Sequence, residues 1–384
     1  MLRILTKRRR GAMKSYIFIS LILIFCISAV AQDVDKQKTN LPDPKGKARF
    51  EIKDRDWPAK FAEASVCLWK NDAIGALSIT IDDNCAPDHE WWTEMGKKYD
   101  FNVTWFVIAS TVSGSNAGFC GTWEGFAKLL KLGHDIQSHS LTHLNQESPE
   151  WKDINMEYEE SQKRIEKNIP GHKAVVLAYP GGKNSNLNDS AVAVKYYIGA
   201  RGTTGSVNAT NKTSYLNTAS MSGVICYGDA KWESQDLKSA LEKGFAKNKD
   251  LYRAWYCCHF HQAKPEVRSL IEKQLALVSE KAKAGELWIG LFKDVVKYGQ
   301  ERDTAVLNVK ESSPDKIVIS LTDEMKDQIF DYPLTVKVRL DPSWKSLKAE
   351  QGGKKADCRI VEKDGAVYGI VEIVPDKGDA VISK

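Results

Sequence analysis

Residues 73–83 read AIGALSITIDD, an apolar and β-branched run that ends in two adjacent carboxylates, Asp82 and Asp83. A run of this kind is typical of a buried strand in a parallel sheet. The segment that follows, PDHEWWTEMGKKYD (87–100), predicts a helix that begins at its proline and ends near Asp100. This strand-then-helix unit sets the pattern for most of the chain.

The same alternation of strand and helix patterns continues to about residue 302. Further strands are expected at 101–109, 134–140, 173–180, 196–202, 254–261 and 286–292, and helices at 122–133, 149–169, 187–196, 234–247, 265–285 and 293–302. Alternation of this kind predicts parallel strands joined by crossover helices. Seven or eight such units are enough to close a (β/α) barrel. The active site of such a barrel lies at the carboxyl ends of its strands.

The pattern changes after about residue 303, where only alternating strand patterns remain. They lie at 315–323, 332–340, 358–374 and 379–384, with the hairpin signal Asp364-Gly365 inside the third. These patterns predict a small all-β, sandwich-like domain. The predicted organisation is a signal peptide over 1–31, a linker or lead-in over 32–65, a barrel over 66–303 and a β-sandwich over 304–384.

The N-terminus has the features of an export signal. Six basic residues within 1–14 precede an apolar run over 16–30, and Ala29-Val30-Ala31 is a small-residue cleavage pattern before Gln32. A retained membrane anchor is the alternative, but the run is shorter than the ~20 residues that a spanning helix needs. We expect cleavage, a periplasmic or extracellular protein, and no stable membrane insertion.

Export changes how charge and cysteines are interpreted. Removing the six signal charges from the formal net charge of +5 leaves a mature chain near −1, which gives no reason to expect a nucleic-acid partner. Seven cysteines follow Cys26, and an exported protein can form disulfides, although the sequence does not say which. No CxxC pair indicates a structural cysteine zinc site.

Two of the polar motifs at predicted strand ends suit a metal site. Asp82 and Asp83 can have different roles, one binding a metal and the other acting as a base. Acids in such a loop can also simply cap the next helix. His139 and His143 share a face if their segment turns helically, and neutral imidazoles bind zinc well. Taken alone, an HxxxH pair also arises by chance.

Two further motifs suit acyl hydrolysis. Tyr179-Pro180-Gly181-Gly182 follows a strand, and a glycine N–H there can donate to a developing oxyanion, although a plain turn explains it equally well. His259-Phe260-His261 ends a later strand, where a histidine can act as a general acid or be merely structural. Asp83, His139 and His143 would give zinc three protein ligands and leave a position for water.

The motifs TIDD (80–83), SHSLTH (138–143), YPGG (179–182) and HFH (259–261) together resemble the NodB-homology polysaccharide deacetylases, carbohydrate esterase family 4. The resemblance covers about 70–298. It implies a distorted barrel that removes acetyl groups from chitin, peptidoglycan, xylan or related glycans. It also implies roles for the site residues: Asp82 as catalytic base, Asp83, His139 and His143 as ligands of Zn²⁺ or another divalent metal, Gly181 as oxyanion donor and His261 as general acid.

The sequence departs from the family pattern at two points. Ala178 stands where many members carry an arginine that orients the base, and no acid is assigned to orient His261, for which Asp229 and Asp236 are weak candidates. N-acetyl hydrolysis is the expected activity. The alternatives are an O-acetyl (xylan-type) esterase and a catalytically weak glycan-binding barrel. The tryptophans considered as sugar platforms, with packing as the alternative, are Trp91, Trp92 and Trp232.

Overall fold

The computed structural model describes residues 51–113, 118–145, 153–182, 187–203, 207–211, 214–222, 235–247 and 249–384. The predicted signal peptide over 1–31 lies outside these residues, as do Cys226, Asp229, Trp232 and the side chain of Asp236. Among the described helices, none combines the length and the apolar character that a membrane crossing requires.

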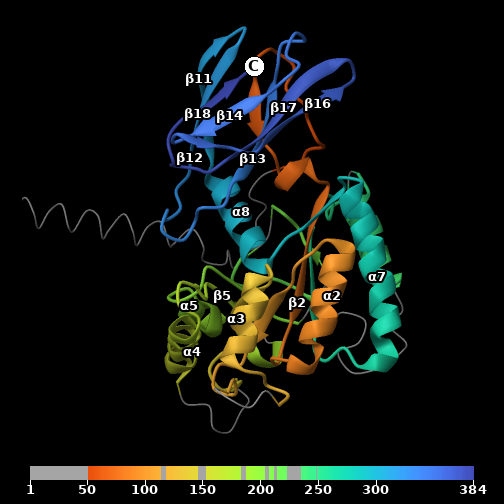
Figure 1. Cartoon of the computed structure of the whole chain (residues 1–384), viewed down its shortest axis with the longest axis vertical. Coiled ribbons are helices and arrows are strands. Elements are labelled where there is room, and N and C mark those ends of the chain that lie inside the picture. Colours follow the sequence, from red (N-terminus) through yellow and green to blue (C-terminus); the bar gives the residue numbers. More distant parts are fainter. Residues whose placement is uncertain are drawn as a thin grey trace, which may run out of the picture. The chain divides into compact units, whose positions relative to one another are not determined.

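A nine-stranded sheet forms the centre of the N-terminal part (Figure 1). Its strands follow the order β6-β5-β4-β3-β2-β9-β7, with β10 paired to β2 and β8 paired to β9. All of these pairings are parallel except that of β7 with β9. The strands are β2 (Gly75–Ile81), β3 (Thr104–Val107), β4 (Asp135–Ser138), β5 (Val176–Ala178), β6 (Gly199–Arg201), β7 (Val207–Asn208), β8 (Met221–Ser222), β9 (Trp255–Phe260) and β10 (Leu287–Ile289). The predicted parallel sheet is confirmed.

The sheet curls into a distorted, incompletely hydrogen-bonded barrel. Its outer edge at β6 is extended by the segment 214–222, in which Thr218 bridges to Arg201 and β8 pairs with β9. The predicted barrel is therefore confirmed in an irregular form, with a short segment between β6 and β9 in place of a full strand.

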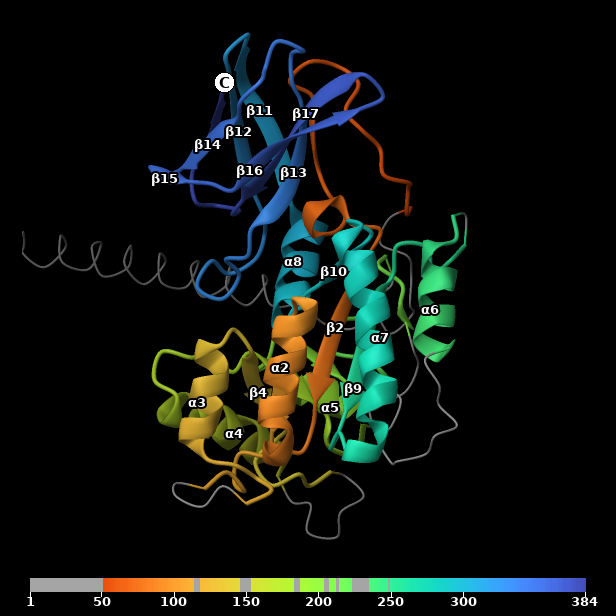
Figure 2. The ribbon, with the colours of Figure 1, turned by 45° about the vertical axis from the view of Figure 1, so that its right-hand side comes forward.

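Helices follow the strands as the alternation predicted. They are α2 (His89–Tyr99), α3 (Trp123–Lys131), α4 (Ile154–Asn168), α5 (Leu187–Ala193), α6 (Gln235–Phe245), α7 (Pro265–Lys283) and α8 (Phe292–Thr304). Asp100 ends α2 in a left-handed conformation, and Thr122 caps α3 by accepting a hydrogen bond from the Gly125 amide. Figure 2 shows α2 and α7 side by side against β2.

Both faces of β2 are buried, which explains why the strand carries no charged residue. Leu77, Ile79 and Ile81 belong to the core between the sheet and helices such as α2 and α7. Ala76 belongs instead to a second core, which includes side chains of α8. A strand buried on both faces has no polar side to expose, and only its end is free to carry the carboxylates.

The C-terminal part consists of two antiparallel sheets, ordered β1-β13-β17-β16 and β11-β12-β18-β14-β15 (Figure 2). Their strands are β1 (Ala64–Val66), β11 (Val306–Ser313), β12 (Lys316–Thr322), β13 (Leu334–Arg339), β14 (Lys348–Gln351), β15 (Lys354–Lys355), β16 (Cys358–Lys363), β17 (Ala366–Ile373) and β18 (Ala380–Ser383). The predicted all-β region is confirmed. β1 comes from the boundary between the predicted lead-in and barrel, and one apolar core joins these sheets to α8.

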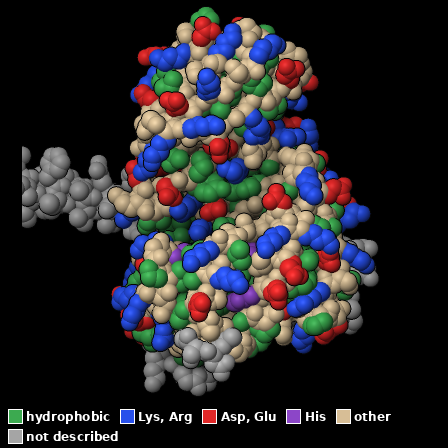
Figure 3. All heavy atoms as spheres, viewed as in Figure 1, with side chains coloured by type: hydrophobic (Ala, Val, Ile, Leu, Met, Phe, Trp, Pro, Cys, Tyr) green, Lys and Arg blue, Asp and Glu red, His purple; other side chains and the backbone are tan. Residues whose placement is uncertain are grey.

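The face of the molecule in Figure 3 carries Lys and Arg interspersed with Asp and Glu rather than an extended field of one sign.

Candidate active site

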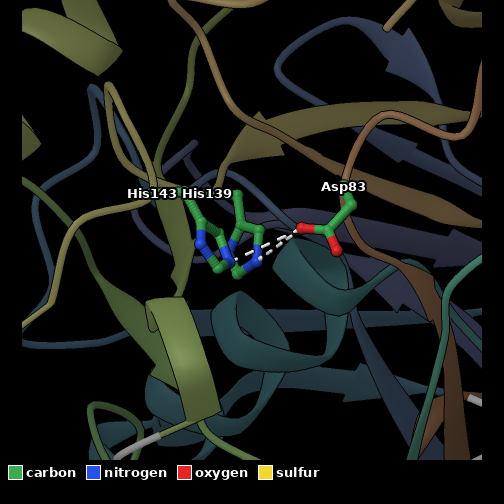
Figure 4. A group of neighbouring side chains, drawn as sticks. All are labelled: Asp83, His139 and His143. Carbon is green, nitrogen blue, oxygen red and sulfur yellow. Dashed lines mark ion pairs between the residues drawn. The ribbon is translucent and has the colours of Figure 1, made fainter. Parts of the chain in front are cut away.

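The predicted metal ligands come together at the carboxyl ends of β2 and β4. Asp83 Oδ1 lies 3.5 Å from His139 Nε2 and 3.6 Å from His143 Nε2. Figure 4 shows both imidazoles directed at this one oxygen. The three ligand atoms lie within 4.8 Å of one another, and among the described residues they form the group that could hold a metal ion.

These distances fit an ion better than direct hydrogen bonds. Asp83 Oδ1 is buried and has no hydrogen-bond partner among the described residues. Zinc–nitrogen and zinc–oxygen bonds of about 2.0 Å in tetrahedral geometry separate neighbouring ligand atoms by about 3.3 Å. The observed separations of 3.5 and 3.6 Å are close to that value. The donor set of two imidazoles and one carboxylate is also one that zinc accepts.

Each ligand has a fixed orientation. The Nδ1–H of His139 donates to the Ala178 carbonyl at 2.8 Å, which leaves Nε2 free to bind a metal. Asp83 has φ 58° and His143 has φ 66°, both in the left-handed region. Non-glycine residues in this region cost free energy and persist where their surroundings hold them, often at functional sites.

The turn that carries the histidines is not helical, so the helical basis for pairing them was wrong. Ser140 is left-handed with φ 64°, and its hydroxyl accepts from the His143 amide at 3.0 Å. Glu157 on α4 clamps the turn, since its carboxylate accepts from the Thr142 amide at 2.9 Å and from the Thr142 hydroxyl at 2.6 Å. The two rings still meet, with centroids 4.8 Å apart.

Asp82 lies beside the metal ligands but is not a free carboxylate. It is 2% exposed and forms an ion pair with Arg201, which is fully buried at the end of β6. Burial favours the neutral acid, but the Arg201 guanidinium holds the pKa of Asp82 well below its usual range. The sequence analysis missed Arg201, although a charged residue that ends an apolar strand was an available signal.

His261 lies on the other side of Asp83. Its Nε2 is 3.4 Å from Asp83 Oδ2, and the side chain is partly exposed. His259, its neighbour in the motif, is buried and pairs through Nδ1 with the Ser220 hydroxyl at 2.8 Å. Burial, with the Arg201 charge adding, lowers the pKa of His259 to about 3. His259 is therefore neutral at physiological pH and more enclosed than His261.

Gly181 lies in a short 3-10 turn (Pro180–Gly182) directly after β5. It is exposed and has φ 66°, and a Cβ atom there would lie 2.7 Å from Asn145 Nδ2. Only glycine fits this conformation and this space without displacing Asn145. The structure thus leaves an exposed stretch of backbone next to the histidine turn, as an oxyanion donor requires.

Two predicted sugar platforms are not available to a substrate. Trp92 is fully buried against Phe260, with ring centroids 5.1 Å apart, and Trp91 is 9% exposed beneath Arg268. The packing alternative is confirmed for both.

Parts of this chain are similar to known proteins. A model described as polysaccharide deacetylase matches residues 70–200. Gellan lyase from a Bacillus species is 33% identical over 380 residues, which are 93% of this chain but only 15% of that protein. The chain thus spans a small fraction of the length of this relative.

Solved structures are similar at a lower level. The deacetylase PplD of Streptococcus pyogenes in complex with acetate shares 23% identity over 38% of this chain and 62% of its own, with a TM-score of 0.33. The family 4 acetyl xylan esterase of Clostridium thermocellum in complex with cobalt shares 14% over 57% and 89%, with a TM-score of 0.36. The predicted resemblance to the NodB-homology polysaccharide deacetylases is confirmed over residues 70–200, the part of the chain that contains the TIDD, SHSLTH and YPGG motifs.

Proposed function

We propose that this protein is an exported, metal-dependent deacetylase that hydrolyses N-acetyl groups of a glycan. The observation that carries the proposal is the convergence of two histidines on Asp83 Oδ1, which is buried and has no hydrogen-bond partner in the described part of the chain. Asp82 and His261 lie beside it. The family match supports the class of substrate. The signal-like sequence over 1–31 supports export to the periplasm or the cell exterior.

Asp83, His139 and His143 would hold the metal, for which zinc is our proposal. When bound, a divalent ion polarises the acetyl carbonyl and makes a water molecule more acidic. Asp82, ionised and buried, accepts the proton of that water as it attacks the carbonyl carbon. The Gly181 N–H donates to the oxygen of the tetrahedral intermediate. His261 gives a proton to the leaving nitrogen, so that one amide and one water become one amine and acetic acid.

The test is acetate release by the purified chain from Gln32 onward, with zinc added or chelated. The substrates are chitooligosaccharides, peptidoglycan fragments and acetylated xylan. We expect zinc-dependent release that Asp82→Asn abolishes, whereas the matched control Asp294→Asn, which changes a carboxylate in the first turn of α8, keeps it. Release from xylan alone would identify an O-acetyl esterase. Zinc binding without release from any substrate would favour the glycan-binding alternative.

Export needs its own measurement. We expect the secreted or periplasmic protein to begin at Gln32 in N-terminal sequencing. A full-length chain that stays in the membrane fraction would contradict the proposed signal cleavage.

A further inference from the structure

Arg201 is an unusual residue for the interior of this barrel. It is 0% exposed, at the end of β6, and its guanidinium lies 4.8 Å from the centre of the Phe106 ring. A buried guanidinium is costly unless a charge compensates it. Asp82 is the carboxylate that does so, at the end of β2 and 119 positions earlier in the sequence.

The remaining contacts of Arg201 are weak. Nη1 donates to the Gly202 carbonyl at a long 3.5 Å, and Nε has no partner among the described residues. Phe106 supplies a flat apolar surface rather than a polar one. The position of the guanidinium is therefore set chiefly by Phe106 on one side and Asp82 on the other.

The contact acts on one oxygen of the carboxylate. Arg201 Nη2 binds Asp82 Oδ1, while the Asp82 amide donates to the Phe260 carbonyl at 2.8 Å. Backbone and side chain are thus both held, and rotation about the Cβ–Cγ bond is restricted. The other oxygen, Oδ2, is therefore held in one direction. A base that is already oriented does not lose conformational entropy when it accepts the proton of the attacking water.

The register of the sheet shows where an equivalent arginine could also stand. Ala178 on β5 pairs with Arg201 on β6 in a parallel ladder. Register partners in a parallel ladder point to the same face of the sheet, and Ala178 lies in the same apolar core as Phe106. Position 178 is therefore one strand away from Arg201 on the same inner face.

We propose that Arg201 is the positioning residue of the base Asp82, supplied from β6 in place of an arginine at position 178 of β5. This assignment rests on the proposed deacetylase function. It makes a prediction that a purely structural arginine would not: the guanidinium can be moved from one strand to the next and still serve Asp82.

The experiment compares wild type, Arg201→Ala, and the double variant Arg201→Ala with Ala178→Arg. Kinetics are measured on the best glycan of the panel, with zinc content as the measure of an intact site. We expect Arg201→Ala to lower kcat by about 100-fold with KM changed less than threefold, since general-base catalysis contributes about 10²- to 10⁴-fold. The double variant should recover at least tenfold of that loss. The control Arg253→Ala removes another buried arginine, paired with Asp72 away from the motif residues, and should keep kcat.

Three results would overturn this assignment without affecting the proposed function. They are a wild-type kcat in Arg201→Ala, a loss of kcat in Arg253→Ala equal to that in Arg201→Ala, or a folded, zinc-loaded double variant whose kcat is no higher than that of Arg201→Ala. If the alanine variants do not fold, Arg201→Lys replaces them, because lysine keeps the charge but not the planar fork. A tenfold lower kcat with zinc retained then supports the assignment, and wild-type kcat overturns it. An inactive wild-type chain would overturn the proposed function and this assignment with it.

Discussion

Replacing Asn84 should loosen the loop that presents Asp83. Asn84 is fully buried and left-handed, with φ 65°. Its Oδ1 accepts from the Ile108 amide at 2.8 Å, and its Nδ2 donates to the Thr111 hydroxyl at 3.2 Å and to the Cys120 carbonyl at 3.0 Å. One side chain therefore ties the end of β2 to the loop after β3.

The magnitude follows from these contacts. Three hydrogen bonds at about 1 kcal/mol net each are lost in Asn84→Ala, and the left-handed backbone disfavours alanine by about 1 kcal/mol more. We expect the free energy of unfolding to fall by about 4 kcal/mol. Because Asp83 immediately precedes Asn84 in the chain, the affinity for zinc should also fall, by about 10- to 100-fold.

The assay is urea unfolding followed by tryptophan fluorescence, together with zinc titration. The matched control is Asn168→Ala, an exposed asparagine of α4 whose Nδ2 donates to the Arg164 carbonyl at 2.8 Å. That variant should change stability by less than about 0.5 kcal/mol. An Asn84→Ala protein within about 1 kcal/mol of wild type, with unchanged zinc affinity, would refute the reasoning.

Three further changes test other parts of the structure. Zinc at 100 times its dissociation constant should stabilise the wild-type protein by about 2.7 kcal/mol and Asp83→Ala hardly at all, as measured by thermal unfolding; equal shifts would place the bound metal elsewhere. Burial, with Asp323 adding, raises the pKa of Glu301 on α8 from 4.5 to about 9. The stability that this neutral group contributes is complete below pH 4.5 and is lost as the pH rises to about 9. Glu301→Gln should therefore be more stable than wild type by about 3 kcal/mol at pH 7 and equal to it near pH 4. Stability differences between the two proteins that stay constant from pH 4 to 9 would contradict this. Trp92→Ala should lower the free energy of unfolding by about 3–5 kcal/mol, and a stable variant with a raised KM would instead make Trp92 a sugar platform.

The barrel and the positions of its motifs were predictable because local pattern and global fold agree. β2 is buried along its whole length without a charged residue, and its acids come only after its end, where a parallel barrel builds its sites. His139 likewise comes directly after β4, and Gly181 comes three positions after the end of β5. The end of a strand can be recognised locally in the sequence. Four motifs that follow strand ends of one barrel are therefore expected to lie close together.

What the sequence did not reveal depends on contacts between distant segments. Arg201 pairs with Asp82 across 119 positions, and Glu157 binds Thr142 from the first turn of the next helix. β1 is only three residues long and joins a sheet whose other strands lie more than 260 positions away. No periodicity encodes such pairings, because each partner alone resembles an ordinary polar or short extended segment.

The clamps missed by the sequence analysis and the ligands it found are parts of one arrangement. Asp83 and His143 both occupy left-handed backbone, which an unrestrained loop would leave. Asn84 holds the first of these loops and Glu157 the second, each through the hydrogen bonds of a buried side chain. These surrounding hydrogen bonds, and not only a bound metal, therefore offset the free-energy cost of the left-handed backbone at Asp83 and His143. It follows that the site is largely formed before an ion binds, so that removing zinc should abolish activity while leaving the clamped loops in place.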